Sequence, residues 1–178
     1  MNAPIRGRFS LFDHHAQPVT DRSYHGRWML VLFGFTHCQV VCPRALAKYS
    51  AVIERLEPTG AAQVKPLYVT VDPERDSPEV MRNFLQSKYP LFTGLTGPAP
   101  AIEAVKDAFS VFTRRRPDTA DPDGYAVVHS AMAFLLNPDG EYVAHFSDAA
   151  TTETILDRLR EILAEAAGPC CHSQSAGG

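Results

Sequence analysis

The sequence predicts an α/β protein with a central mixed sheet, because strand-like apolar segments alternate with segments of helical periodicity along its 178 residues. Two of the strand-like segments, residues 28–35 and 64–71, are almost continuously apolar, which is typical of strands buried on both faces of a sheet. The turn Asn137-Pro138-Asp139-Gly140 separates two later apolar segments and predicts a hairpin. The hairpin adds antiparallel strands to the parallel strands that helical crossovers connect, so the predicted sheet is mixed.

The first half of the chain opens with a predicted hairpin over residues 8–20, which combine a short strand, Phe9 to Phe12, with a polar turn. After the strand at 28–35, a helix is expected, because Pro43 suits a first helical turn and apolar residues follow it at helical spacing. These apolar residues are Leu46, Tyr49, Ile53 and Leu56. Residues 36–43 should therefore form the junction between a central strand and a helix.

The turn at residues 72–79 predicts the next helix, with Asp76 or Ser77 as its cap and Pro78 in its first turn. A further helix is expected from Pro98 to Phe109. Residues 114–124 should form a charge-balanced polar loop, since three arginines are followed closely by three aspartates. The remaining elements are three strands, at 125–128, 131–136 and 141–146, and a final helix from Thr152 to Ala166.

This order of elements is thioredoxin-like: three layers, a central mixed sheet, an N-terminal hairpin and a C-terminal helix. We expect one domain over residues 1–167 and a flexible tail over 168–178, because Gly168-Pro169 stops the last helix. The net charge of -3 provides no basic field for nucleic acid. No window approaches the ~18 apolar residues that span a membrane, so no membrane contact is expected from the chain itself.

Two of the four cysteines, Cys38 and Cys42, lie at the predicted strand-to-helix junction. Free N–H groups and the helix dipole favour thiolates there, so both thiols are expected to have lowered pKa values. Their spacing leaves two chemistries open, since the pair can close a disulfide or offer two thiolate ligands to a soft ion. Two thiolates suit Cu(I) better than zinc, and one added imidazole would complete a trigonal site that also admits Cu(II).

The segment from Phe33 to Cys38, followed by Cys42-Pro43, resembles the signature loop of the Sco/SenC family. Further segments resemble that family in the same order: a strand and turn at 69–79, a strand at 91–97, and a histidine strand and hairpin at 125–130 and 137–140. The resemblance covers roughly residues 5 to 165 of the chain.

This resemblance implies a thioredoxin fold and a copper site formed by Cys38, Cys42 and a distant histidine, which by position is His129. It also implies a role in loading the CuA centre of cytochrome c oxidase, as a copper donor, as a thiol reductant of the target, or as both. The implied partners are a copper-receiving protein, such as an oxidase subunit, and a thiol reductant. Sco proteins work outside the bacterial cytoplasm or in the mitochondrial intermembrane space, tethered by an N-terminal helix. We therefore expect a periplasmic location, with the anchor or signal absent from this chain, or a cytoplasmic one if Met1 is the true start.

The chain departs from the family pattern in three places. Gln39 and Val40 stand where the family commonly has Pro and Asp, and Val128 stands where an Asp commonly precedes the histidine. The third departure is a tail that carries Cys170, Cys171 and His172. None of these changes removes a ligand, but together they leave room for a specialised relative with another copper target.

Several other side chains have open roles. His37 should point away from the adjacent Cys38, and it is either a ligand or a group that tunes the thiols. Asp72 ends a central strand, where open α/β sheets place their sites, and it either supports the thiols or only forms the turn. Asp76 is expected to act as a cap. The tail ligands, Cys170, Cys171 and His172, either take up copper for the domain or form an oxidation-prone end.

The leading functional hypothesis is a metallochaperone that holds copper at Cys38, Cys42 and His129. The alternative is a thiol-disulfide oxidoreductase, in which Cys38, as the more exposed thiol, attacks a partner disulfide and Cys42 resolves the product. A peroxidase is a weaker third class, because it gives no role to the histidine. His129 therefore discriminates between the classes: its loss should weaken copper binding and matter little to disulfide exchange.

Overall fold

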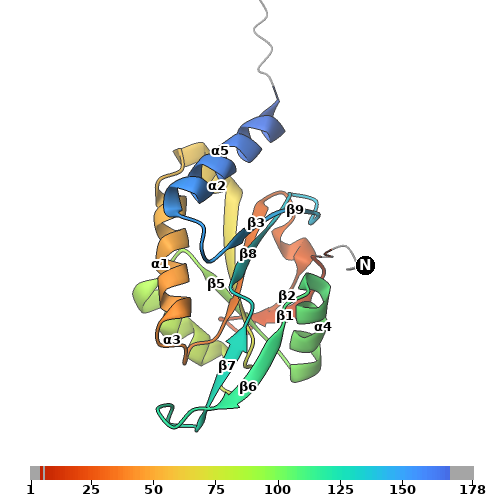
Figure 1. Cartoon of the computed structure of the whole chain (residues 1–178). Coiled ribbons are helices and arrows are strands. Elements are labelled where there is room, and N and C mark those ends of the chain that lie inside the picture. Colours follow the sequence, from red (N-terminus) through yellow and green to blue (C-terminus); the bar gives the residue numbers. More distant parts are fainter. Residues whose placement is uncertain (1–4, 6, 169–178) are drawn as a thin grey trace, which may run out of the picture.

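The computed structural model describes residue 5 and residues 7–168, whose strands form one seven-stranded sheet and a separate two-stranded ribbon. The order in the large sheet is β2-β1-β5-β4-β3-β8-β9 (Figure 1). The central strands β3, β4 and β5 are parallel, whereas β8 and β9 join them in antiparallel pairs. Their bounds are β3 Trp28–Gly34, β4 Val64–Thr70, β5 Thr93–Thr96, β8 Met132–Leu136 and β9 Tyr142–Ser147. The predicted mixed sheet and its late hairpin are confirmed.

The predicted N-terminal hairpin is also present. Strands β1 (Ser10–Asp13) and β2 (Pro18–Thr20) are antiparallel, and β1 pairs in addition with β5 at the edge of the large sheet. A short 3₁₀ helix, η1 (Asp21–Tyr24), leads from the hairpin toward β3. The hairpin thus extends the sheet on the side away from β8 and β9.

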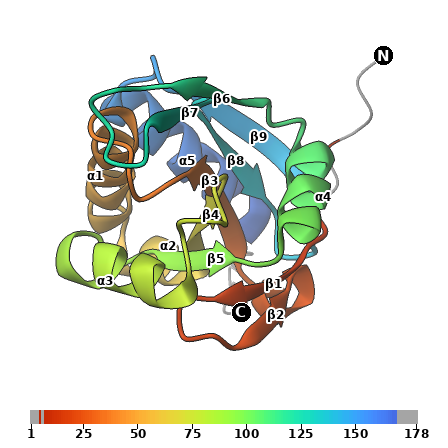
Figure 2. The ribbon, with the colours of Figure 1, turned by 90° about the horizontal axis from the view of Figure 1, so that it is seen from below.

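Helices cover both faces of the sheet, which gives the expected three layers (Figure 2). One face carries α1 (Val41–Glu54), α3 (Pro78–Lys88) and α5 (Thr152–Ala167), and the other carries α4 (Ala99–Phe109). Helix α4 packs on the sheet through Phe109, whose ring centroid lies 5.3 Å from that of Phe33 on β3. The short helix α2 (Pro58–Gln63) is not predicted from the sequence, because its six residues cannot establish a helical period.

The start of α3 corrects one expectation. Ser77 is the N-cap, and its hydroxyl accepts a hydrogen bond from the Val80 N–H at 3.3 Å. Asp76 is not a cap: its side chain is fully buried, and its carboxylate is bound on the other side by two threonines. Asp and Ser are both common N-cap residues, so the sequence alone could not tell whether Asp76 or Ser77 caps α3.

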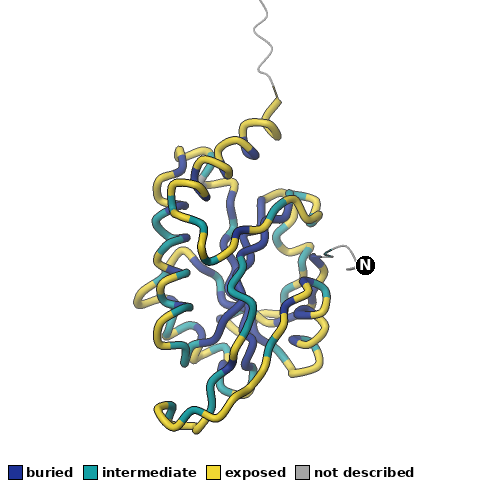
Figure 3. The backbone as a smooth tube through the Cα atoms, in the orientation of Figure 1, coloured by how far each residue is buried: buried dark blue, intermediate teal, exposed yellow. Residues whose placement is uncertain are grey.

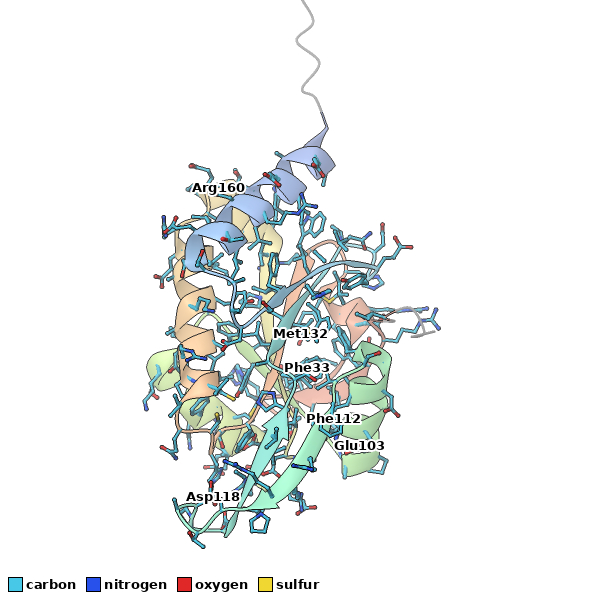
Figure 4. All side chains as sticks on the ribbon, in the orientation of Figure 1. Phe33, Glu103, Phe112, Asp118, Met132 and Arg160 are labelled. Atoms are coloured by element: carbon cyan, nitrogen blue, oxygen red, sulfur yellow. The ribbon has the colours of Figure 1, made fainter. Side chains whose placement is uncertain are left out.

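The predicted polar loop at residues 114–124 is wrong over its first part. Residues Thr113–Pro117 form strand β6, which pairs antiparallel with β7 (Tyr125–His129) in the two-stranded ribbon. Figure 4 shows Phe112 near one end of this ribbon and Asp118 at its tip. Because the ribbon stands apart from the large sheet, the middle of β6 is exposed. Its sequence is three consecutive arginines, so it lacks the alternation of apolar and polar residues that would indicate a strand.

The arrangement of the core brings distant segments to one edge of the sheet. Every residue of β3 is buried, and the same holds for most of β4 (Figure 3). Gly34 and Thr70, the last residues of these parallel strands, are register partners. The segments that follow them therefore begin side by side, and β8, antiparallel to β3, starts at this same edge just after His129. This edge is where a site can be assembled from both halves of the chain.

Candidate functional site

The two inner cysteines lie at the junction between β3 and α1. Cys42 is the second residue of α1 and only 3% exposed, whereas Cys38 is half-buried in the preceding loop. The backbone N–H of Cys42 donates a hydrogen bond to the Cys38 Sγ atom at 3.3 Å. Both cysteines are free thiols. The expected difference in exposure between them is therefore observed.

His129 reaches this junction from the end of β7. Its Nε2 atom lies 3.5 Å from the Cys42 Sγ atom, and its Nδ1 atom lies 3.1 Å from the carbonyl oxygen of Ser130. Because a carbonyl can only accept, Nδ1 carries the proton, and in the neutral ring Nε2 presents a lone pair toward the sulfur. This tautomer, fixed by a backbone carbonyl, is the one needed to bind a metal through Nε2.

Cys42 contacts both other residues, Cys38 through its backbone N–H and His129 through its sulfur. Within residues 7–168, no three Cys, His, Asp or Glu side chains are already gathered around one point in a way that could hold a metal ion. To bind an ion, Cys38, Cys42 and His129 would have to turn toward a shared point. Two sulfurs and one imidazole nitrogen are nevertheless a donor set that suits Cu(I).

The pKa values of the two thiols move in opposite directions. Hydrogen bonding from the Cys42 side chain, helped by backbone N–H groups of the first helical turn, lowers the pKa of Cys38 to about 5 despite its burial. The same pairing with Cys38, together with burial, raises the pKa of Cys42. The expectation that both pKa values are lowered is therefore wrong for Cys42. The reason is that the pair shares a proton, which the more buried sulfur retains.

A buried tyrosine lies beneath the thiols. Tyr68 on β4 is 1% exposed, and its hydroxyl donates a hydrogen bond to the carbonyl oxygen of Phe35 at 3.2 Å. The nearby Tyr68 side chain opposes the rise in the pKa of the Cys42 thiol. Sequence reasoning missed Tyr68, because an aromatic residue within an apolar strand indicates only a core position.

The close approach of that hydroxyl to the sulfur depends on a glycine. A Cβ atom at Gly34 would lie 2.3 Å from the Tyr68 hydroxyl oxygen and 2.8 Å from the Cys42 Sγ atom. These distances are far below van der Waals contact. Gly34 thus leaves the space that the hydroxyl and the sulfur both border.

A buried carboxylate fixes the start of the cysteine loop. Asp76 accepts hydrogen bonds from the Thr36 N–H at 3.1 Å, the Thr36 hydroxyl at 2.5 Å and the Thr70 hydroxyl at 2.6 Å. Burial raises the pKa of Asp76, although these donors partly oppose the rise. Since Thr36 lies two residues before Cys38, the carboxylate holds the backbone from which that thiol projects.

His37 makes its contacts on the side of the ribbon. Its Nδ1 atom lies 3.2 Å from the Thr36 hydroxyl, and its Nε2 atom lies 3.8 Å from the carboxylate of Asp123. Asp123 belongs to the β6–β7 connection. His37 therefore links the cysteine loop to the ribbon.

Asp72 anchors the ribbon and makes no hydrogen bond to either inner cysteine in the described part of the chain. Its fully buried carboxylate accepts hydrogen bonds from Arg75 Nε at 2.5 Å, Arg115 at 3.3 Å and the Tyr125 hydroxyl at 3.2 Å. The guanidinium of Arg75 lies 3.9 Å from the centre of the Tyr125 ring and also contacts Asp121 at 3.0 Å. This cluster ties the end of β4 to both strands of the ribbon, and it thereby helps to place His129.

A groove of about 440 Å³ opens beside the thiols. Its lining includes Cys38 and His129, together with the exposed side chains of Val40 and Val128. The two ligand candidates can therefore be approached from solvent. The tail residues Cys170, Cys171 and His172 lie outside the described residues.

The three layers, the mixed sheet and the cysteine pair at a strand-to-helix junction define a thioredoxin-like protein. The chain belongs to the SCO1/SenC family, whose pattern matches residues 1–164.

Individual relatives agree with this assignment. The mitochondrial SCO2 homologue of Bos taurus is 39% identical over 160 residues, which make up 89% of this chain and 60% of the relative. The copper-bound ScoI structure of Bradyrhizobium japonicum is 36% identical, covers 88% of this chain and 98% of its own, and has a TM-score of 0.78. The copper-bound ScoI structure of Arabidopsis thaliana reaches a TM-score of 0.84 at 29% identity, with coverages of 90% and 99%.

The chain thus spans about three fifths of the length of the Bos taurus relative. Among the helices that the structure describes, none has the length and apolar character needed to cross a membrane.

Proposed function

We propose that this protein binds copper through Cys38, Cys42 and His129 and delivers it to another protein. The observation that carries the proposal is the contact of His129 Nε2 with Cys42 Sγ, in the tautomer that suits metal binding. A set of two thiolates and one imidazole favours Cu(I) among the common metal ions. Two related ScoI proteins have been solved with copper bound, which supports the same metal here.

The position of the thiols suits delivery by ligand exchange. Cys38 is half-buried and borders the groove, whereas Cys42 lies behind it at 3% exposure. A soft ligand of a partner can therefore reach an ion on the side of Cys38 while Cys42 and His129 still hold it. Release then proceeds one ligand at a time, so no free ion is required.

The proposed recipient is a respiratory copper protein, and in the first place the CuA site of cytochrome c oxidase. The proposed location is the outer side of a bacterial membrane. Membership of the SCO1/SenC family supports this recipient, and the mitochondrial SCO homologues among the relatives support a location outside the bacterial cytoplasm. A thiol reductant is a second expected partner, because only reduced cysteines bind copper.

A second function, thiol-disulfide exchange, is favoured by the asymmetry of the cysteine pair. The half-buried thiol has a lowered pKa and the buried one a raised pKa, as expected for an attacking and a resolving cysteine. In this role Cys38 attacks a partner disulfide, and Cys42 then displaces the partner and closes the Cys38–Cys42 disulfide. Reduction of an oxidised recipient could precede its metallation by the same protein.

An anaerobic Cu(I) titration of the reduced full chain, with a competing chelator, tests the leading proposal. The test set is wild type, Cys38→Ser and Cys42→Ser. The matched control is the double variant Cys170→Ser/Cys171→Ser, which removes the other two cysteines of the chain. We expect tight one-to-one binding in wild type and control, and loss of that binding in both single variants. Binding that survives in the single variants and disappears in the control would move the site to the tail and overturn the proposal.

A further inference from the structure

The β6–β7 ribbon has two faces, because side chains alternate along each of its strands. Arg114 is the register partner of Val128, and Arg116 is that of Ala126, so these four side chains share one face. Phe112 lies on the same face by alternation, and its carbonyl continues the pairing by accepting a hydrogen bond from the Ser130 N–H at 3.1 Å. The face formed by Phe112, Arg114, Arg116, Ala126 and Val128 is called the outer face of the ribbon below.

The outer face exposes two large apolar side chains beside two arginines. Phe112 is 63% exposed and Val128 is 42% exposed. Arg114 and Arg116 are exposed as well, and neither forms an ion pair within residues 7–168. Arg115, which lies between them and points to the other face, contacts two carboxylates. Aromatic and arginine side chains are the types that protein interfaces favour, so the composition of the outer face is that of a docking surface.

The outer face is continuous with the groove at the thiols. Arg116 and Val128 belong to it and also line the groove, which reaches Cys38 and His129. His129 directly follows Val128 in β7. A protein seated on the outer face therefore lies at the mouth of the groove, from which a soft ligand can reach an ion.

We propose that the outer face of the ribbon docks the copper-receiving protein, and that this recipient meets it with carboxylates around an apolar patch. The inference rests on the proposed function, since it names the surface by which that function finds its partner. The guanidinium groups of Arg114 and Arg116 attract acidic side chains at long range and orient the recipient. Phe112 and Val128 supply the apolar contact that holds the complex during ligand exchange.

Charge argues against two other occupants of this face. Polybasic segments that bind anionic membranes carry about four to eight basic residues, whereas the outer face carries Arg114 and Arg116 alone, on a chain of net charge -3. A second copy of this chain, bound by two-fold symmetry, would bring like-charged arginines into one contact. A recipient with an acidic face meets neither obstacle.

The first test is Cu(I) transfer from the loaded full chain to the soluble, copper-free CuA domain of the cytochrome c oxidase from the same organism. Rapid quenching and mass spectrometry of the recipient give the second-order rate constant at several salt concentrations. The test variant is Arg114→Glu/Arg116→Glu. The matched control, Arg8→Glu/Arg22→Glu, makes the same change in net charge outside the ribbon, at two exposed arginines that form no ion pair within residues 7–168.

We expect the wild-type rate constant to fall as salt rises, because salt screens the attraction between opposite charges. In the test variant it should fall about tenfold at low salt and then rise with salt, because the interaction has become repulsive. The control should keep the wild-type rate and its decline with salt. Both variants should keep the Cu(I) affinity of wild type, since neither replaces a ligand, and this affinity also shows that they are folded.

A second measurement needs no copper. Surface plasmon resonance follows the binding of the reduced, copper-free chain to the same CuA domain. Phe112→Ser should raise the dissociation rate constant several-fold, because the exposed ring is lost from the contact. Phe12→Ser, which removes an exposed phenylalanine from β1, is its control and should bind as wild type does.

The outcomes separate this inference from the proposed function. If Arg114→Glu/Arg116→Glu binds and transfers copper as wild type does, the inference alone fails. If no form of the protein binds copper, but the copper-free association is lost in this variant and kept in its control, the docking surface stands and the proposed function fails. Flotation with vesicles of equal parts phosphatidylcholine and phosphatidylglycerol tests the membrane, and sedimentation tests the second copy. Vesicle binding or a dimer that the test variant abolishes would overturn the inference.

Discussion

The Nε2 atom of His129 lies 3.5 Å from the Sγ atom of Cys42, although 87 positions separate the two residues in the chain. Cys42 belongs to α1, which packs on the large sheet, whereas His129 belongs to the separate β6–β7 ribbon. The ribbon is held through the carboxylate of Asp72 and the guanidinium of Arg75. The proposed ligand set is therefore divided between two structural units, so the position of the ribbon decides how close His129 lies to the cysteines.

Replacing His129 with alanine should separate copper binding from thiol chemistry. We expect the Cu(I) affinity of His129→Ala to fall about hundredfold, or about 2.7 kcal/mol, because one of three ligands is lost. The rate of disulfide exchange with a model disulfide should change little. His145→Ala, on the exposed side of β9, is the control and should keep both activities. A variant that keeps its copper affinity but loses exchange would favour the oxidoreductase function instead.

The sequence was sufficient for the elements with a strong apolar period. Strands β3 and β4 were predicted as buried, and helix α5 was predicted with its five buried residues on one side. The position of Cys38 and Cys42 at a strand-to-helix junction followed from the same pattern. Strand β6 was missed, because a ribbon outside the large sheet needs no apolar alternation.

The surroundings of the thiols were less accessible to sequence reasoning. Asp76 looks like a cap in the sequence, and only the pairing of β3 with β4 places it against Thr36. Tyr68 looks like a core aromatic until its hydroxyl is found beside Cys42. The opposite pKa shifts of the two thiols depend on which sulfur is buried and keeps the proton. Such features depend on tertiary contacts, for which a single sequence carries no periodic signal.

The reactivity of Cys38 should follow its lowered pKa. In reduced, metal-free protein, the rate of alkylation by iodoacetamide should rise with a midpoint near pH 5 and level off above it, since the thiolate is the nucleophile. The measurement is best made in the Cys170→Ser/Cys171→Ser background, so that only the inner thiols can react. Cys42 should remain unreactive over this range, because it is 3% exposed and its pKa is raised.

The matched variant for this prediction is Cys42→Ala, which removes the side-chain hydrogen bond to Cys38 and keeps the backbone N–H groups. The largest cause of the lowered pKa is then gone, so the midpoint should move upward. A midpoint that stays near pH 5 in Cys42→Ala would assign the effect to the helix terminus instead of the neighbouring thiol.

Asp76 should make the stability of the protein depend on pH. Burial raises the pKa of Asp76 in the folded state, so the folded protein keeps this proton at pH values where the unfolded chain has lost it. The contribution of Asp76 to stability is thus complete below the unfolded pKa and declines as the pH rises through the folded one. Each unit of upward shift corresponds to about 1.4 kcal/mol.

Urea unfolding of wild type and Asp76→Asn between pH 4 and pH 7 measures this contribution. Asparagine cannot ionise, so the difference in unfolding free energy between the two proteins should be larger at pH 4 than at pH 7. A difference that grows toward pH 7 would show that the threonine hydrogen bonds dominate and that the pKa of Asp76 is lowered instead.

Gly34 should be intolerant of a side chain because of the hydroxyl and the sulfur that meet beside it. In Gly34→Ala the new methyl group would lie 2.3 Å from the Tyr68 oxygen and 2.8 Å from the Cys42 sulfur, so one of them must move. We expect a loss of about 1–3 kcal/mol in unfolding free energy, the usual range for overpacking a core.

The double variant Gly34→Ala/Tyr68→Phe removes the closer contact and should recover part of that loss, whereas Gly34→Ala/Tyr49→Phe should not. Urea unfolding of the single and double variants forms a double-mutant cycle, and its coupling energy is expected to be favourable for Tyr68 and near zero for Tyr49. Equal behaviour of the two double variants would mean that the methyl group is limited by the sulfur, and that the hydroxyl lies farther from the junction than the structure shows.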